Sequence, residues 1–301
     1  MNYKEWLNFW LTNYVKTTCK RHTWVLYCHT VERRIVPYIG EVNLSELDLQ
    51  TVQSFVNTLA SSDGCALAAN TVNGVITVLQ GSLKVAYELG HVPAYFGNKI
   101  RHPKSCEKKV ESLTVLEQKQ LEEYIARSDR LKLNGIVICL YTGLRLGELL
   151  ALKWQNVDMR RAQLTVTSTC YCVGNERFLD SPKTAHSLRT IPFPRQLLPV
   201  FRKLHKRAKT EFVIEEKGMP VGYRSMQRSF ELLLKRLNLE HKGFHALRHT
   251  FATRALECGM DVKTLSELLG HKNPNVTLRR YAHSMLEHKK QMMNRLGRLF
   301  A

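Results

Sequence analysis

Four short segments carry the residues that could do chemistry, and cationic side chains dominate them. They are "TGLRLGE" with Arg145, "SPKTAHSLRTIP" with Lys183, "HALRHTFAT" with Arg248 and "LGHKNPNVTLRRYAH" with His271 and Tyr281. An isolated tyrosine hydroxyl has a pKa of about 10 and is a poor nucleophile at neutral pH. A reactive tyrosine therefore needs nearby cations that favour the phenolate and a base that accepts its proton.

The first segment places Arg145 close to the start of a predicted helix, because Gly143 ends the apolar segment before it. The helix dipole opposes a cation at that end, so something else must favour the arginine there. A bound anion would suffice, since backbone N–H groups and a guanidinium can grip phosphate oxygens together. The alternative is a surface ion pair between Arg145 and Glu148, which would contribute well under about 1 kcal/mol.

The third segment places His245, Arg248 and His249 on one face of a predicted helix. The HxxxH spacing also occurs in zinc sites, but the metalloprotease pattern needs a glutamate directly after the first histidine, where Ala246 stands. An arginine between the two histidines would also repel a dication. The sequence therefore predicts no metal at this site.

The remaining candidates have plain structural alternatives when each is taken alone. Gly270 is predicted to end a helix and so to place His271 on the loop beyond it. A short helix that opens after Asn273 leads to Tyr281, which would ordinarily be a half-buried packing residue. Lys183 precedes a turn between two predicted strands, where a lysine is commonly a solvated charge at the edge of a sheet.

A mainly helical scaffold must position these segments. Residues 1–90 predict a bundle of four helices, and residues 91–111, with two prolines, a glycine and five Lys or Arg, predict a basic linker. Residues 112–284 predict a second domain, in which the β-branched stretch 162–193 forms three short strands with turns at 174–175 and 184–186. Residues 285–301, with Met and Leu residues at near-helical spacing, predict a helical tail.

Charge is the strongest signal in the composition. The 301 residues carry a formal net charge of +19, and the part after residue 110 holds 33 Lys or Arg against 18 Asp or Glu. This balance favours a polyanionic partner, either nucleic acid or an anionic membrane surface. The longest apolar run, "GIVICLYTGL", is about half of what a spanning helix needs, so nucleic acid is the predicted partner.

The cysteines and the N-terminus bear on the compartment. The eight cysteines form no CxxC pair and are interpreted as reduced thiols, and "MNYKEWLNFW" lacks the order of regions of a signal peptide. The predicted location is therefore the cytoplasm.

In their wording, order and spacing the four segments resemble the tyrosine recombinase, or phage integrase, family. The resemblance covers the whole chain, because residues 1–90 are similar to that family's helical, SAM-like core-binding domain. It implies a mainly α protein with a small antiparallel β-sheet, forming a two-domain clamp on duplex DNA, with the catalytic domain in residues 112–284. The tail, residues 285–301, resembles that family's C-terminal helix that docks on a neighbouring subunit, and packing on its own domain is the alternative.

The resemblance also implies the proton transfers. Tyr281 would be the nucleophile, and Lys183 would be the general acid that protonates the leaving 5′-oxygen. His245 would act as a general base or as a hydrogen-bonding group. The covalent 3′-phosphotyrosine that results would retain the energy of the broken bond, so rejoining would need no ATP, cofactor or metal.

The same resemblance assigns the groups that stabilise the transition state. Arg145 and Arg248 would hold the non-bridging oxygens, and His271 would brace the phosphoryl group. Fixed cations of this kind replace the metal ions that other phosphoryl-transfer enzymes use. Glu148 and His249 would support these side chains.

The implied function is a site-specific DNA recombinase that acts as a homotetramer on two recombination sites through a Holliday junction. The wording of "SPKTAHSLRTIPF" favours a mobile-element integrase, for which a directionality factor is an optional partner. Three alternatives stay open: a recombinase that resolves chromosome or plasmid dimers, a type IB topoisomerase-like enzyme, and a catalytically silent DNA-binding relative. The sequence shows no arm-binding domain of the kind that larger integrases carry, so we expect either the simpler architecture or a protein that lacks this module.

Location within the resembling domains predicts five residues that contact DNA. They are Lys20, Arg21, Thr71, Lys84 and Arg228. Phosphate contacts of this kind position a protein without specifying a base sequence.

Overall fold

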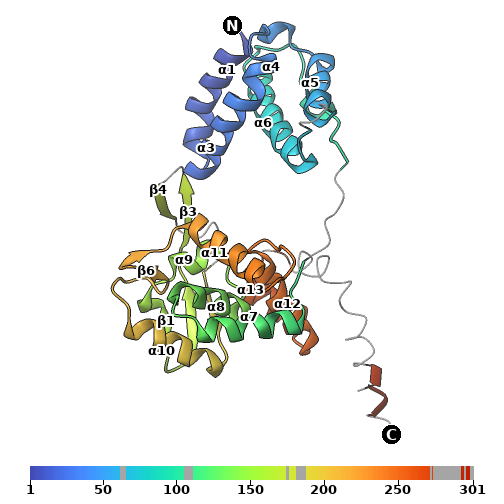
Figure 1. The fold of residues 1–301 in the computed structure, drawn as a ribbon. Coiled ribbons are helices and arrows are strands. Elements are labelled where there is room, and N and C mark those ends of the chain that lie inside the picture. The colour runs from blue at the N-terminus through green and yellow to red at the C-terminus, as the bar shows by residue number, and fades with distance from the viewer. Residues whose placement is uncertain are drawn as a thin grey trace. The chain divides into compact units, whose positions relative to one another are not determined.

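The computed structural model describes residues 1–61, 66–104, 111–173, 176–180, 188–271, 273, 293–294 and 296–298 (Figure 1). The chain divides into two compact units, Met1–Lys108 and Lys109–Ala301. None of the helices in these described ranges is both long and apolar enough to cross a membrane.

The first unit is a helical bundle around an aromatic core. Its helical segments are α1 (Tyr3–Trp10), the π-helical η1 (Leu11–Val15), α2 (Lys16–Thr18), α3 (Arg21–Thr30), the π-helical η2 (Val31–Ile35), α4 (Val36–Ile39), η3 (Leu44–Glu46), α5 (Leu49–Ser61), α6 (Ala69–Glu88) and η4 (Gly97–Lys99). One face of α1 is an apolar stripe in which Trp6, Leu7 and Trp10 are buried. Asp48 caps α5 by accepting the Thr51 N–H at 2.8 Å.

The segment expected to begin a linker packs instead on the first unit. Val92 and Ile100 are each 3% exposed and belong to its core. The Arg101 N–H donates to the Gln53 side chain at 2.8 Å. The prolines, the glycine and the charges of this stretch are typical of a linker. Its two apolar residues, Val92 and Ile100, nevertheless hold the described part, 91–104, against the bundle.

The second unit packs helices around the buried helix α8. Its helices are α7 (Val115–Arg127), η5 (Leu131–Leu133), α8 (Asn134–Thr142), α9 (Leu146–Ala151), η6 (Trp154–Asn156), η8 (Arg195–Leu197), α10 (Leu198–Lys206), α11 (Tyr223–Arg236), α12 (Ala246–Glu257) and α13 (Val262–Leu269). Helix α8 packs against α12. Helix α7 begins with a capping box, in which Thr114 and Glu117 exchange hydrogen bonds of 3.2 Å and 2.6 Å.

The strands that the structure describes in the second unit form three small antiparallel sheets. They are β1 (Val157–Asp158), β2 (Gln163–Val166), β3 (Thr169–Val173), β4 (Glu176–Asp180), β5 (Arg189–Pro192), β6 (Glu215–Glu216) and β7 (Met219–Pro220). The sheet orders are β1-β2-β5, β3-β4 and β6-β7. In the first sheet Leu164 pairs with Ile191 and Val166 pairs with Arg189.

Two details of the strand prediction were wrong. The stretch expected as one strand over 162–173 splits into β2 and β3, which pair in different sheets, so the chain changes sheet at residues 167–168. The three strands predicted for this domain all lie within 162–193, but the region after Pro194 also contains the hairpin β6–β7. Lys217 and Gly218 both have positive φ, 55° and 74°, which is the backbone of a tight two-residue hairpin turn. The predicted turns at 174–175 and 184–186 lie outside the described residues.

Candidate active site

The turn between α8 and α9 presents Arg145. Gly143 ends α8 in the left-handed conformation, with φ 65°. A Cβ at this position would lie 2.5 Å from the ring of Phe251, so the site also requires the absence of a side chain. Two residues later Arg145 is the N-cap residue of α9, and its side chain is 39% exposed. The predicted start of a helix at this arginine is confirmed.

Glu148 lies beneath Arg145 and is 6% exposed. Its carboxylate accepts the Arg145 backbone N–H at 2.9 Å and the Arg145 Nη1 at 2.8 Å. It also accepts hydrogen bonds from both terminal nitrogens of Arg189, at 3.1 Å and 2.8 Å. Glu148 is therefore a buried carboxylate shared by two arginines, and not one half of an exposed surface pair.

The pKa of Glu148 reflects this environment. Burial alone would raise it, because a low-dielectric surrounding disfavours the charged form. The hydrogen bonds and charges of Arg189, followed by the charge and backbone N–H of Arg145, outweigh burial and lower the pKa of Glu148 to about 2. The carboxylate is thus charged at any physiological pH and holds Arg145 in one orientation.

Arg248 lies on α12 and is 2% exposed. Its Nη1 donates to the carbonyl of Gly143 at 2.8 Å, and its Nη2 donates to the carbonyl of Leu269 at 2.6 Å. The first contact joins α12 to the turn that carries Arg145, and the second joins it to the C-terminus of α13. Because the guanidinium is planar, contacts on two sides fix its orientation.

The C-terminus of α13 presents His271. Gly270 adopts φ 65°, and the N–H groups of Gly270 and His271 bond to Glu267 and Ser266, each at 3.0 Å. This is a Schellman motif, which confirms the predicted end of the helix at Gly270. The Nε2 of His271 lies 3.0 Å from Arg248 Nη2. Because an arginine can only donate, this ring nitrogen is the acceptor.

The two histidines at the start of α12 lie against each other. The rings of His245 and His249 are 4.7 Å apart between centroids and nearly perpendicular. His245 is exposed and His249 is half-buried. Within the described part of the chain, no three His, Cys, Asp or Glu side chains are grouped so that they could hold a metal ion.

The structure thus brings four of the predicted site residues into one connected cluster and leaves two undescribed. Arg145, Glu148, Arg248 and His271 are linked by the contacts above, through the turn at Gly143 and the end of α13. Lys183 and Tyr281 lie outside the described residues.

Sequence reasoning missed Arg189, the second arginine on Glu148. It begins β5, and its side chain is 7% exposed. A signal was present, because side chains alternate along a strand and Arg189 shares its face with the buried Ile191. The charge of Arg189 argued against an inward position, and its partner lies 41 residues away in sequence.

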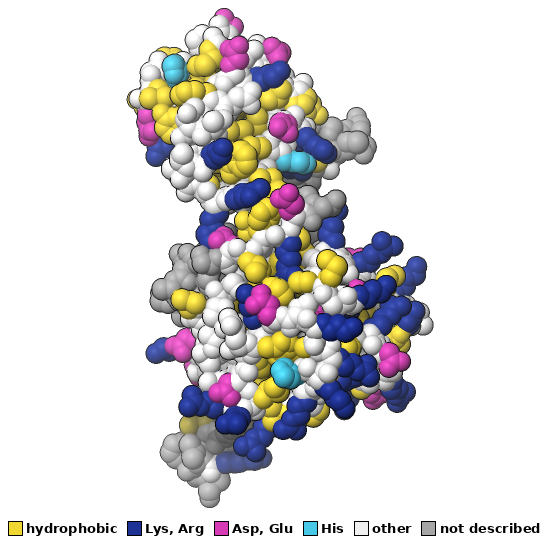
Figure 2. Space-filling model, turned by 90° about the vertical axis from the view of Figure 1, so that its left-hand side faces the viewer, with side chains coloured by type: hydrophobic (Ala, Val, Ile, Leu, Met, Phe, Trp, Pro, Cys, Tyr) yellow, Lys and Arg dark blue, Asp and Glu magenta, His cyan; other side chains and the backbone are white. Residues whose placement is uncertain are grey.

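The predicted DNA-contacting residues are spread over both units. Arg21 and Lys84 are exposed in the first unit, and Lys20 and Thr71 are half-buried there. Arg228 is exposed on α11 of the second unit. Figure 2 shows many Lys and Arg side chains on one side of the second unit, in keeping with the charge excess after residue 110.

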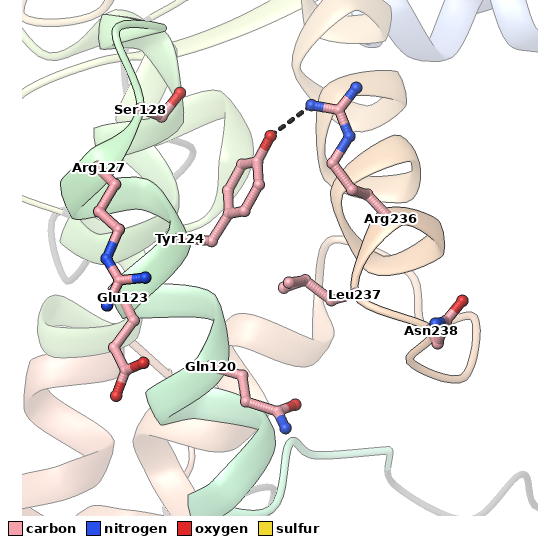
Figure 3. Close-up of a pocket in the computed structure, with 8 residues that line it drawn as sticks. All are labelled: Gln120, Glu123, Tyr124, Arg127, Ser128, Arg236, Leu237 and Asn238. Carbon is pink, nitrogen blue, oxygen red and sulfur yellow. Dashed lines mark hydrogen bonds between the residues drawn. The ribbon is translucent and has the colours of Figure 1, made fainter.

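A groove between α7 and α11 lies apart from the cluster of Arg145, Glu148, Arg248 and His271 (Figure 3). The Arg236 guanidinium lies 5.8 Å from the centre of the Tyr124 ring and donates to its hydroxyl. Gln120, Glu123 and Arg127 complete much of its wall. Of the predicted catalytic residues that the structure describes, namely Arg145, His245, Arg248 and His271, none lines this groove.

Comparisons with known proteins bear on both units. Residues 112–288 match the phage integrase family, and residues 2–60 match the N-terminal SAM-like domain of phage integrases. A "Tyrosine recombinase XerC-like" protein from Caldanaerobacter subterraneus subsp. tengcongensis is 28% identical over 98% of this chain and 82% of its own length. The ICEBs1 integrase of Bacillus subtilis is 22% identical over 90% of this chain and 76% of its own length.

Solved structures share the fold. The Tn1549 transposon integrase in complex with transposon right end DNA superposes with a TM-score of 0.82 and 22% identity, covering 99% of this chain and 100% of that one. The lambda integrase tetramer bound to a Holliday junction gives a TM-score of 0.70 and 19% identity, covering 91% and 78%.

Proposed function

The chain belongs to the phage integrase family of tyrosine recombinases, enzymes that cleave and rejoin DNA, and on this premise we propose that it is the integrase of a mobile element. The observation that carries the catalytic part is the cluster of Arg145, Arg248 and His271. These three side chains come from three separate helix ends and are tied together by hydrogen bonds.

The cluster suits phosphoryl transfer. Attack on a phosphodiester builds negative charge on the non-bridging oxygens, and cations that are already oriented stabilise this charge without reorganising. Arg145 and Arg248 would bind those oxygens, and His271 would brace them from the end of α13. Before the substrate arrives, Glu148 would hold the guanidinium of Arg145. The carbonyls of Gly143 and Leu269 would hold the guanidinium of Arg248.

Residues outside the described ranges complete the proposal. Tyr281 would attack the phosphorus, forming a bond between its phenolic oxygen and the 3′-phosphate while the bond to the 5′-oxygen breaks. Lys183 would give a proton to that 5′-oxygen. His245 would accept the phenolic proton or hold it by a hydrogen bond, and His249, which packs on the ring of His245, would keep that ring in place.

Two observations favour an integrase over a dimer-resolving recombinase. The likeness to the Tn1549 transposon integrase runs over 99% of this chain, and the relatives include the ICEBs1 integrase and the integrase of Staphylococcus phage L54a. The relatives also include Xer recombinases, so the dimer-resolving role is the second candidate.

We further propose how the chain meets DNA. The first unit would serve as the core-binding domain and the second as the catalytic domain, with Lys20, Arg21, Thr71, Lys84 and Arg228 on phosphates. The lambda integrase forms a tetramer on a Holliday junction, and this chain would assemble in the same way. The predicted cytoplasmic location and the directionality factor stay predictions.

A recombination assay tests the proposal. Two plasmids would carry the joined ends of the element and the matching chromosomal sequence, both taken from the DNA that flanks the gene. In EDTA, an integrase yields recombinant plasmids, and Tyr281→Phe yields none. Recombination only between two identical chromosomal sites would favour the dimer-resolving role, and relaxation of supercoils without recombination would indicate a topoisomerase-like enzyme.

A further inference from the structure

Arg189 occupies an unusual position for an arginine. It is the first residue of β5, in register with Val166 of β2, and its side chain is 7% exposed. Arginine side chains are rarely buried to this degree unless they are paired. The groups that pair with Arg189 therefore indicate why the fold places it there.

The guanidinium of Arg189 is engaged on two sides. Its Nη1 and Nη2 donate to the two carboxylate oxygens of Glu148, at 3.1 Å and 2.8 Å. Its Nε donates to the carbonyl of Leu268 at 2.7 Å. A Cβ at Gly270 would lie 2.9 Å from Arg189 Nη1, so the guanidinium also lies directly against the backbone of that glycine.

These contacts connect the segments that carry the proposed catalytic residues. Through Glu148, Arg189 reaches the first turn of α9 and Arg145. Through Leu268 it reaches the last turn of α13, three residues before His271. The adjacent carbonyl, that of Leu269, accepts Arg248. Two arginines thus satisfy two of the last carbonyls of α13, at the negative end of the helix dipole.

We propose that Arg189 is a positioning residue for DNA cleavage: it sets the relative placement of Arg145 and His271 by holding Glu148 and the end of α13 at once. The inference rests on the proposed function. It goes beyond it because it assigns Arg189 a role that works through Glu148 and the carbonyl of Leu268.

The geometry requires an arginine and not only a positive charge. A guanidinium offers five N–H donors in a rigid fork that matches a carboxylate through two parallel bonds. A lysine has one nitrogen on a flexible stem and cannot hold both oxygens of Glu148 and a carbonyl on a third side in fixed geometry. Arg189→Lys is therefore expected to keep the positive charge but to hold Arg145 and His271 less firmly in their relative positions.

The test measures cleavage, DNA binding and folding separately. The substrate is a nicked duplex that traps the covalent protein–DNA adduct, and the adduct is followed in single turnover. Arg189→Met is expected to lower the cleavage rate by at least about 100-fold, the size of effect that misplacing reacting groups by about 1 Å produces, with DNA affinity within about threefold of wild type. The cleavage rate of Arg189→Lys is expected to lie between those of Arg189→Met and wild type.

Arg254→Met is the matched control. Arg254 also pairs a carboxylate, that of Glu257, and a backbone carbonyl, that of Leu113 at 2.8 Å, and its side chain is 27% exposed. It contacts none of the proposed catalytic residues through these bonds. The cleavage rate of Arg254→Met is expected to stay within about threefold of wild type.

A measurement on folded protein separates positioning from folding. The melting temperature of Arg189→Met is determined first, and cleavage is then measured well below it, where circular dichroism shows the variant to be folded. If Arg189 only stabilises the fold, the folded variant cleaves at the wild-type rate. If Arg189 positions the site, the folded variant still cleaves at least about 100-fold more slowly than wild type.

Each outcome has one meaning. Cleavage by folded Arg189→Met at the wild-type rate overturns the positioning role and leaves the proposed function intact. A wild-type chain that forms no adduct refutes the proposed function and the positioning role with it.

Discussion

Replacing Glu148 by glutamine tests the electrostatics of the cluster. Glutamine keeps the shape of the side chain and removes its charge, so Arg145 and Arg189 lose a shared carboxylate that is 6% exposed. The difference between the ordinary carboxyl pKa of 4.5 and the value of about 2 in the folded chain corresponds to about 3 kcal/mol. Removing one partner of a buried ion pair has a cost of about that size.

The pH dependence follows from the direction of the shift. A carboxyl whose pKa is lowered by folding stabilises the folded chain fully above its unfolded pKa of 4.5, and this contribution is lost as the pH falls toward about 2. Near pH 7 Glu148→Gln should therefore reduce the free energy of unfolding by about 3 kcal/mol, and near pH 3 by only about 1 kcal/mol.

The assay is a pair of urea titrations of the full chain, followed by circular dichroism near both pH values. Glu216→Gln is the matched control, because Glu216 pairs with Lys132 at 2.8 Å but is 45% exposed. It should change the free energy of unfolding by less than about 1 kcal/mol at either pH. An equal loss for Glu148→Gln near pH 7 and near pH 3 would refute the reasoning, since it would mean that the charge of Glu148 contributes nothing.

Four further substitutions have defined outcomes in thermal or urea unfolding. Gly143→Ala should destabilise by about 1–3 kcal/mol because of its φ of 65°, whereas Gly74→Ala, on an open face of α6, should stabilise slightly. Lys242→Met should lower the free energy of unfolding by about 3 kcal/mol, because it leaves the largely buried carboxylate of Glu117 without its ion-pair partner. An unchanged unfolding midpoint would contradict this. Tyr3→Phe should cost about 1 kcal/mol, because the buried Tyr3 hydroxyl lies 2.7 Å from Ser82; no loss would show that bond to be neutral.

Local features of the fold could be predicted from the sequence because their causes are local. The caps at Asp48 and Thr114 depend on contacts three residues away, and the helix ends at Gly143 and Gly270 depend on one left-handed residue each. The order of the four cationic segments was enough to indicate the family, although no segment alone could do so.

Long-range features could not be predicted in this way. The pairing of Arg189 with Glu148 and the sheet change between β2 and β3 depend on residues far apart in the chain. The packing of 91–104 on the first unit depends on two apolar residues within a stretch that otherwise has the composition of a linker. Periodicity within a segment does not specify which distant segment it meets.

The measurement that tests the central claim most directly is the identity of the residue bonded to DNA. The trapped adduct would be digested with nuclease and trypsin, and the peptide that carries the nucleotide would be sequenced by mass spectrometry. Trypsin should release residues 281–289, "YAHSMLEHK", whose single tyrosine is Tyr281. A 3′-phosphonucleotide on Tyr281, absent from Tyr281→Phe, is the predicted result. A nucleotide on any other residue, or an adduct that persists in Tyr281→Phe, would contradict the account.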